Sequence, residues 1–291
     1  MDKALRKYAP IFVIPTTAAF VIGFVIPFIE GLYLSFCRFT TISNAKWTGL
    51  DNFKYALTDE AFRHSFVFTV SFAVVSIILI NVGGLGLALL LTRKLRGTNV
   101  FRTIFFMPNL IGGIVLGYIW QILINCILSN VGKPLLALNS TAGYWGLIIL
   151  MCWQQIGYMM IIYIAGLQAV PEDMLEAAKI DGATKTQTLF RVVIPNVMPS
   201  ITICTFLSLT NGFKLFDQNL ALTGGLPFEI QPDGSSIKTT EMLALNIYNT
   251  FSGSSISAHG TAQAKAVLFF ILVAAIGLVQ LGITRKREVQ Q

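Results

Sequence analysis

The sequence predicts an all-α, polytopic membrane protein with six transmembrane helices. Of its 291 residues, 54% are hydrophobic and 12% are charged, and this charged share is about half that of an ordinary soluble domain. The apolar residues gather in runs that are long enough for a helix to cross a bilayer, which takes roughly 20 residues. The charged residues gather between these runs. Lipid offers no partner to an unpaired backbone group, so each run is expected to be helical.

Six runs are predicted to span the bilayer, and their interiors carry almost no charge. The first follows Lys3, Arg6 and Lys7, as the apolar part of a signal peptide would. It continues to Phe36 without a small-residue cleavage site, so we expect it to remain as an uncleaved span. The predicted spans cover about residues 10–36, 66–91, 104–127, 143–168, 198–222 and 262–283.

Lysine and arginine predict the orientation, because loops on the cytoplasmic side carry an excess of both. An even number of spans places both tails on one side, and both tails are basic. The loops after the second and fourth runs are basic as well. We therefore expect both termini and these two loops in the cytoplasm, and the loops 37–65 and 223–261 outside. The basic residues concerned are Lys3, Arg6, Lys7, Arg93, Lys94, Arg96, Arg102, Lys179, Lys185, Arg191, Arg285, Lys286 and Arg287.

Composition and motifs argue against several function classes. The net charge of +7 could suggest nucleic acid, but the basic residues lie in short blocks between apolar runs, so no nucleic-acid partner is expected. The four cysteines have neither metal-ligand spacing nor a disulfide framework. Neither H-E-x-x-H nor G-x-S-x-G occurs. The sequence therefore predicts no catalytic residue, no metal and no cofactor.

The segment 171–195 is charged and bent, although it lies between two apolar runs. Pro171 suits the first position of a helix that Gly182, in a left-handed conformation, would end. Thr184 and Gln187 form a T-x-x-Q capping box that would start a second helix, and Pro195 would stop that helix. A plain connection could be much shorter. The segment is thus either a simple surface hairpin or a hairpin that docks into another protein.

A sequence pattern within this segment resembles the EAA loop of ABC importer permeases. Glu176, Ala177 and Ala178 are followed by three residues, Gly182, nine residues and V-x-I-P ending at Pro195. The family pattern is E-A-A-x3-G-x9-I-x-L-P, so Val192 stands for Ile and Ile194 for Leu. Other stretches resemble the sugar-type importers, the group with the maltose and glycerol-phosphate systems, over nearly the whole chain: WTGLDNF (47–53), FRTIFFMPNL (101–110), LQAVPEDMLEAAKIDGA (167–183) and LALTGGLP (220–227).

The resemblance implies a single permease domain over residues 1–291 with the type I (MetI-like) architecture, in a bacterial cytoplasmic (inner) membrane. Segment 171–195 would be a cytoplasmic coupling helix seated in a cleft of an ABC ATPase subunit. The chain has no G-x-x-x-x-G-K-[ST] loop, so ATP hydrolysis is expected on that separate subunit and the chain itself is not expected to be an enzyme. The coupling residues would be Glu176, Ala177, Ala178, Asp181, Gly182 and Pro195.

The partners implied are a second permease subunit of different sequence, two ABC ATPase subunits, an extracellular solute-binding protein and the membrane lipid. The substrate would be a sugar or a related carbohydrate. The alternative from the residues alone is an ion-coupled secondary transporter, which would use acids inside the bundle as ion sites. Glu30 and Asp217 approach that role.

Polar residues within spans are costly, and this makes them candidates for a substrate pathway. At positions that contact the sugar in similar permeases, this chain carries Gln154, Gln155, Tyr158, Ser208, Asn211, Gly212 and Leu215. The maltose-type pattern has asparagines at the positions of Gly212 and Leu215, so the resemblance does not imply maltose itself. Aromatic faces beside amide groups suit a sugar, which stacks its C–H faces and hydrogen-bonds its hydroxyls.

Other polar residues within the spans have plainer interpretations. Lys214 and Asp217 are three apart and could pair on one helix face, or both could lie near the outer interface with Lys214 snorkelling. For Asn81 and Gln121 we favour hydrogen bonds between helices. The pair Gly113 and Gly117 permits a close approach of another helix.

Overall fold

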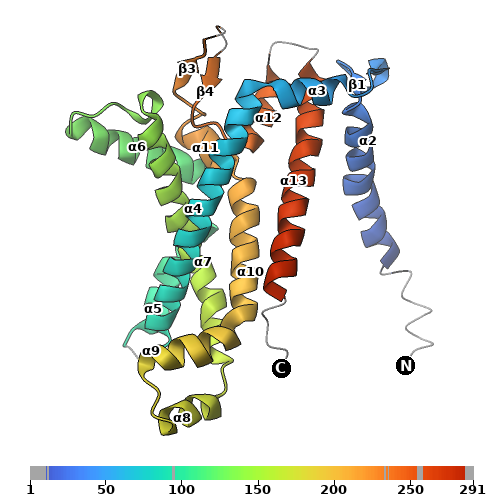
Figure 1. Cartoon of the computed structure of the whole chain (residues 1–291). Coiled ribbons are helices and arrows are strands. Elements are labelled where there is room, and N and C mark those ends of the chain that lie inside the picture. Colours follow the sequence, from blue (N-terminus) through green and yellow to red (C-terminus); the bar gives the residue numbers. More distant parts are fainter. Residues whose placement is uncertain are drawn as a thin grey trace. The chain divides into compact units, whose positions relative to one another are not determined.

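The computed structural model describes residues 11, 13–93, 96–232, 234, 236–253 and 258–285. Within these residues, six helices are long and apolar enough to cross a membrane, which confirms the predicted fold class. The chain divides into two compact units, one within Met1–Asp59 and Ile247–Phe270, the other within Glu60–Asn246 and Ile271–Gln291 (Figure 1). Among the predicted orientation signals, Lys3, Arg6, Lys7, Lys94, Lys286 and Arg287 lie outside the described residues.

The smaller unit contains the first predicted span and the start of the sixth. Residues 13–20 are helical, and the elements that follow are the π-helical turn η1 (Val21–Val25), α2 (Ile26–Leu34), β1 (Cys37–Arg38), the 3-10 turn η2 (Ile42–Asn44), β2 (Lys46–Trp47), α3 (Asp51–Thr58) and the first part of α13 (His259–Arg285). Strands β1 and β2 pair antiparallel. The rings of Phe28 and Phe270 lie 5.2 Å apart and join α2 to α13.

The W-T-G-L-D-N-F stretch holds a tight corner of this unit. The buried amide of Asn52 donates hydrogen bonds of 2.9 Å to the carbonyls of Ser35 and Cys37. A Cβ atom on Gly260 would lie 2.2 Å from the carbonyl oxygen of Cys37, so α13 begins against this corner at a distance that only glycine permits.

The larger unit contains the other predicted spans and the segment 171–195. Its elements are α4 (Glu60–Leu91), α5 (Thr98–Phe106), η3 (Met107–Leu110), α6 (Gly113–Asn130), η4 (Leu136–Leu138), α7 (Ser140–Gln168), α8 (Glu172–Ile180), α9 (Lys185–Thr188), the π-helical turn η5 (Leu189–Val193), α10 (Ile194–Phe213), α11 (Asp217–Leu222), β3 (Phe228–Ile230) and β4 (Ser236–Lys238). Helix α12 (Leu243–Ser252) begins in this unit and ends in the smaller one. The antiparallel pair β3–β4 lies at one end of the unit, and α8 and α9 lie at the opposite end (Figure 1).

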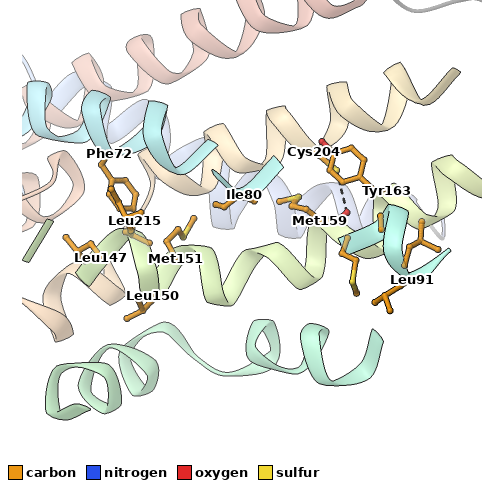
Figure 2. Packing of buried hydrophobic residues seen from close by; sticks show 14 of the residues in the cluster. Phe72, Ile80, Leu91, Leu147, Leu150, Met151, Met159, Tyr163, Cys204 and Leu215 are labelled. Carbon is orange, nitrogen blue, oxygen red and sulfur yellow. Dashed lines mark hydrogen bonds between the residues drawn. The ribbon is translucent and has the colours of Figure 1, made fainter. Parts of the chain in front are cut away.

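Helix α7 is the centre of the larger unit. Its most apolar window is 61% buried, against 28% for α4, so α7 is surrounded by protein on most sides. Side chains of α4, α7 and α10 interlock in the buried cluster drawn in Figure 2, in which Cys204 packs beside Met159 and Tyr163. Small residues allow this packing, because a Cβ atom on Gly84 of α4 would lie 3.1 Å from the Cβ of Met159.

The predicted third span, 104–127, is two pieces rather than one helix. Helix α5 ends at Phe106, and the 3-10 turn η3 that follows it ends at Leu110. Helix α6 begins at Gly113, after extended backbone at Ile111 and Gly112. Pro108 lacks the donor that a longer helix would need there. Gly113 and Gly117 then admit α11, because Cβ atoms on them would lie 2.9 Å from the Cβ of Asp217 and 2.5 Å from the Cβ of Ala221.

The predicted fifth span, 198–222, also differs from one continuous helix. Pro195 does not stop the helix that begins at Lys185, so this prediction is wrong, and helical structure continues through η5 into α10. In the wide π turn the N–H of Ile194 bonds to the carbonyl of Leu189, and this turn accommodates the ring and the missing donor of Pro195. The helix then ends at Phe213, and α11 starts at Asp217. The same device precedes Pro27, where the N–H of Ile26 bonds to the carbonyl of Val21.

Candidate functional site

The hairpin, residues 171–195, owes its bend to two local motifs. Gly182 follows α8 with a φ of 74°, as predicted. The N–H of Ala183 bonds to the carbonyl of Ala178 and the N–H of Gly182 to that of Lys179, which makes a Schellman ending. Thr184 and Gln187 form the predicted capping box at the start of α9. Helix α8 begins at Glu172, with Pro171 as its N-cap residue rather than its first helical position.

The hairpin exposes most of its predicted coupling residues. Glu176, Ala177, Asp181 and Gly182 are exposed, whereas Ala178 is buried and Pro195 is half-buried. Large apolar side chains are exposed beside them, with Ile180 at 85% and Phe190 at 62%. Apolar side chains framed by charge are typical of a surface that another protein covers.

A polar cavity of about 450 Å³ opens where α10 ends and α11 begins. It is lined by Asn109, Met151, Gln154, Gln155, Asn211, Lys214, Leu215, Phe216, Asp217 and Gln218. Helices α7 and α10, the turn η3, the interruption between α10 and α11 and the start of α11 all contribute residues to it. Broken helices inside a membrane protein are tolerated where they line a cavity, because water or ligand can then satisfy the freed backbone groups.

Amide side chains organise the polar cavity. Gln154 donates to the carbonyl of Ile111 at 3.2 Å and accepts a hydrogen bond of 2.8 Å from Gln218. Asn211 donates to Gln155 at 3.2 Å. Gln154 and Gln155 are 5% and 8% exposed, so these bonds fix groups that would otherwise lack partners. The donor and acceptor positions of these amides that remain unused can hydrogen-bond a polar ligand.

The structure brings only some of the predicted pathway residues to this cavity. Gln154, Gln155, Asn211 and Leu215 line it. Tyr158, Ser208 and Gly212 do not line it, although all three are described. Their neighbours lie elsewhere in the unit.

Tyr158 lies beside Phe106, with their ring centroids 6.5 Å apart. Gly212 faces α4, where a Cβ atom would lie 3.6 Å from Ala73. The buried hydroxyl of Ser208 donates to the carbonyl of Cys204 at 2.7 Å. These three positions therefore serve contacts between and within helices.

Sequence reasoning did not place Asn109, Phe216 and Gln218 at a site. Asn109 is the last residue but one of the F-R-T-I-F-F-M-P-N-L stretch, to which the sequence assigns a resemblance but no binding role. Phe216 lies in an interruption that hydropathy does not reveal. Lys214 lines the cavity from the first residue of this interruption and Asp217 from the start of α11, rather than from one helix face. No ion pair joins these two described residues. Both side chains are exposed.

Asn81 and Gln121 bind other helices, as predicted. Asn81 accepts a hydrogen bond of 2.6 Å from the hydroxyl of Tyr163 and donates one of 3.3 Å to Ser208, so it links α4 to α7 and α10. Gln121 donates to the carbonyl of Leu222 at 3.0 Å and links α6 to α11. Among the residues that the structure describes, no group of three or more His, Cys, Asp or Glu side chains could hold a metal ion.

Comparison with known proteins identifies the family of the chain. A family model described as "Binding-protein-dependent transport system inner membrane component" matches residues 81–288. The probable starch degradation products transport system permease protein AmyD of Thermoanaerobacterium thermosulfurigenes is 44% identical over 240 residues, which cover 80% of this chain and 78% of that protein. The multiple sugar-binding transport system permease protein MsmF of Streptococcus mutans is 30% identical over 245 residues, with 81% of each chain covered.

A solved structure shares the fold. It is a bacterial alginate ABC transporter in complex with an alginate pentasaccharide-bound periplasmic protein. Its matching chain has a TM-score of 0.78 and 19% sequence identity, and the match covers 98% of this chain and 96% of that chain. The family match, the identity to curated permeases and the helical architecture lead to one conclusion: the chain belongs to the family of binding-protein-dependent transport system inner membrane components, the permease subunits of ABC importers.

Proposed function

We propose that this chain forms half of the translocation path of an ABC importer for a sugar or related carbohydrate, and that its hairpin couples the path to a separate ATPase subunit. The observation that carries the proposal is the amide-lined cavity at a helix interruption, in a chain that is 44% identical to a permease for starch degradation products.

The chemistry of the polar cavity supports a carbohydrate substrate. Gln154, Gln155 and Asn211 offer donors and acceptors without a fixed charge, which suits hydroxyl groups. Phe216 offers an apolar ring, against which C–H groups of a sugar can stack. A cavity of about 450 Å³ falls within the usual range of small-ligand sites, roughly 300–1,000 Å³. The names of the relatives, which refer to starch products and to multiple sugars, point to the same class.

The shape of the hairpin supports its coupling role. The Schellman ending and the capping box hold α8 and α9 at a fixed bend, with Glu176, Ala177 and Asp181 exposed on it. Helical structure continues from α9 through η5 and α10 to Phe213, whose neighbour Lys214 lines the polar cavity. An ATPase that moves the hairpin would thus act on the cavity through one continuous element.

Membership of the family supports the assembly and the orientation that we propose. A second permease of different sequence would complete the path, two ABC ATPase subunits would bind the hairpins, and a solute-binding protein would deliver the substrate from outside. Both termini and the hairpin would lie in the cytoplasm of a bacterial cell, because Arg93, Lys179, Lys185 and Arg191 occur on that side of the spans. The loops with β3, β4 and α3 would face outward.

Reconstitution of the complete importer in proteoliposomes tests the proposal. We expect uptake of labelled maltooligosaccharides to require ATP and the ATPase subunits, and to persist when an ionophore removes ion gradients. Uptake that continued without the ATPase and collapsed with the ionophore would establish an ion-coupled transporter instead. ATP-driven uptake of a non-carbohydrate solute, with no uptake of any sugar, would retain the ABC importer and overturn the substrate class.

A further inference from the structure

A second cavity of about 680 Å³ lies between the end of α4 and the hairpin, in the larger unit. It is separate from the polar cavity, with which it shares no lining residue. Its lining consists of Leu89, Arg93, Leu175, Lys179, Ala183, Lys185, Thr186, Thr188, Leu189 and Val193. We call it the basic cavity.

Positive charge is concentrated in the basic cavity. Arg93, Lys179 and Lys185 line it, and no aspartate or glutamate does. Among the described residues, none of these three cations forms an ion pair. The hairpin carries four acids within the same short segment, Glu172, Asp173, Glu176 and Asp181, and all of them lie outside the lining. Two of the three cations of the hairpin therefore line the cavity, whereas its four acids lie outside the lining.

A hydroxyl group adds a donor that suits an anion. Thr186 and Thr188 both line the basic cavity; the hydroxyl of Thr188 donates to the carbonyl of Thr184 at 3.1 Å, so that of Thr186 is left to donate to a ligand. Three cations and this hydroxyl suit the oxygen atoms of a phosphate group, which accept several charge-assisted hydrogen bonds at once.

Apolar side chains form the rest of the lining. Leu89 lies in the last turn of the candidate span Glu60–Leu91, and Leu189 and Val193 lie in the candidate span Lys185–Phe213. The cavity thus lies beside the end of one candidate span and the start of another. With both helices crossing a bilayer over these ranges, this is the depth at which lipid headgroups would meet their acyl chains. An apolar wall that continues into the spans, below a rim of cations, fits a molecule with an anionic head and a hydrocarbon tail.

We propose that the basic cavity binds the headgroup of an anionic phospholipid. Arg93, Lys179 and Lys185 hold the phosphate, and the start of an acyl chain lies against Leu89, Leu189 and Val193. Basic cavities between membrane helices on the cytoplasmic side are suited to such headgroups. An acidic segment of a protein partner would match the cations but not the apolar wall that continues into the spans. The bound lipid joins α4 to the hairpin, so lipid composition controls how firmly the hairpin is held.

The test counts lipids on the purified, complete transporter, so its outcome does not depend on the identity of the transported substrate. The transporter is placed in nanodiscs of phosphatidylcholine mixed equally with phosphatidylglycerol, and native mass spectrometry counts the phosphatidylglycerol that stays bound. The test variant is Arg93→Gln/Lys179→Gln/Lys185→Gln. The matched control is Arg191→Gln, which removes a cation from the hairpin outside the cavity lining.

Each cation removed is expected to weaken phosphatidylglycerol binding about fivefold, and the triple variant about a hundredfold. The Arg191→Gln control is expected to retain the lipid. If the triple variant fails to fold, the single variants Lys179→Gln and Lys185→Gln provide the same comparison at about fivefold each.

Three outcomes would overturn the proposal. The triple variant could retain as much phosphatidylglycerol as the unmodified transporter. Inorganic phosphate could displace the bound lipid signal fully, which would make the cavity a site for a small free anion. The triple variant could lose the ATPase subunits while the lipid count stayed unchanged, which would assign the cations to the protein partner.

Discussion

The ammonium group of Lys265 lies 2.6 Å from the carboxylate of Asp59, and the side chain of Lys265 is only 2% exposed. The ammonium also donates to the hydroxyl of Thr250 at 2.8 Å. The pair connects α13 to the residue that follows α3, within the smaller unit. A buried lysine near the start of a predicted span is therefore held by an acid rather than by solvent.

Removing one partner of the buried pair should strongly lower the stability of the protein. We expect Lys265→Met to leave the Asp59 carboxylate without its counter-ion and to cost about 3–5 kcal/mol. Thermal unfolding of the purified protein in detergent measures the effect. As a control, Lys238→Met removes the ion pair between Lys238 and Glu241, which is partly exposed and has a nitrogen–oxygen distance of 3.9 Å. This variant should lose less than about 1 kcal/mol of stability. Equal losses in the two variants would contradict the role of burial.

Gly157 should tolerate no side chain. A Cβ atom there would lie 1.7 Å from the carbonyl oxygen of Phe105, so α5 and α7 must separate to accept alanine. We expect Gly157→Ala to destabilise the protein by about 1–3 kcal/mol or more. Gly86→Ala in α4 is the control, since nothing lies within 4 Å of its Cβ position. Thermal unfolding midpoints of the two variants, measured under the same conditions, test this prediction. Equal midpoints would refute the close approach of α5 and α7 at Gly157.

Gly182 should be required for its backbone conformation alone. Its φ is 74°, and the space around its Cβ position is open to 4 Å. Gly182→Val should therefore strain the bend by about 1–2 kcal/mol and lower recovery of the ATPase subunits in a pull-down about five- to thirtyfold. Gly182→Asn is the control, because asparagine adopts this conformation more readily. Equal recovery of the ATPase with both variants would argue against a coupling role for the bend.

Removing the amide of Gln154 should impair transport and leave assembly with the ATPase subunits unchanged. Gln154→Leu leaves the carbonyl of Ile111 and the amide of Gln218 without their partner in the polar cavity. An unsatisfied buried group costs about 1–3 kcal/mol, so uptake should fall about five- to a hundredfold while ATPase recovery stays constant. Asn130→Leu, on the exposed end of α6, is the control. Unchanged uptake kinetics in Gln154→Leu would remove this residue from the path.

Hydropathy and short local motifs predicted much of the fold. Six spans followed from the apolar runs because a membrane-crossing helix needs length and apolar composition, which the sequence displays directly. The ending at Gly182 and the start at Thr184 were also predictable, since each depends on a few adjacent residues. The hydrogen-bonding roles of Asn81 and Gln121 followed from the cost of polar groups among apolar helices.

The helix interruptions were not predictable in the same way. Residues 111–112 and 214–216 lie within or beside apolar runs. The helices that follow them meet through a contact that is distant in sequence, since α11 packs against Gly113 and Gly117. Pro195 was expected to end a helix, but a π turn before it absorbs the missing donor. Because Pro195 does not end the helix, the helical structure of the fifth span starts before the predicted residue 198 and ends at Phe213, before Lys214. Because the interruption was missed, Phe216 and Gln218 were missed as members of the polar cavity.

Helix α10 (Ile194–Phe213) has a mechanical consequence. Its 20 residues span roughly 30 Å at about 1.5 Å per residue, with η5 and the hairpin at one end and the polar cavity at the other. A helix of this length works as a lever arm, and a tilt of about 10° at one end displaces the other by roughly 5 Å. Because the chain bends at residues 214–216, α11 need not follow that swing. Under the coupling proposed for the hairpin, a modest stroke at the bend of Gly182 would change the separation between Asn211 and Gln218.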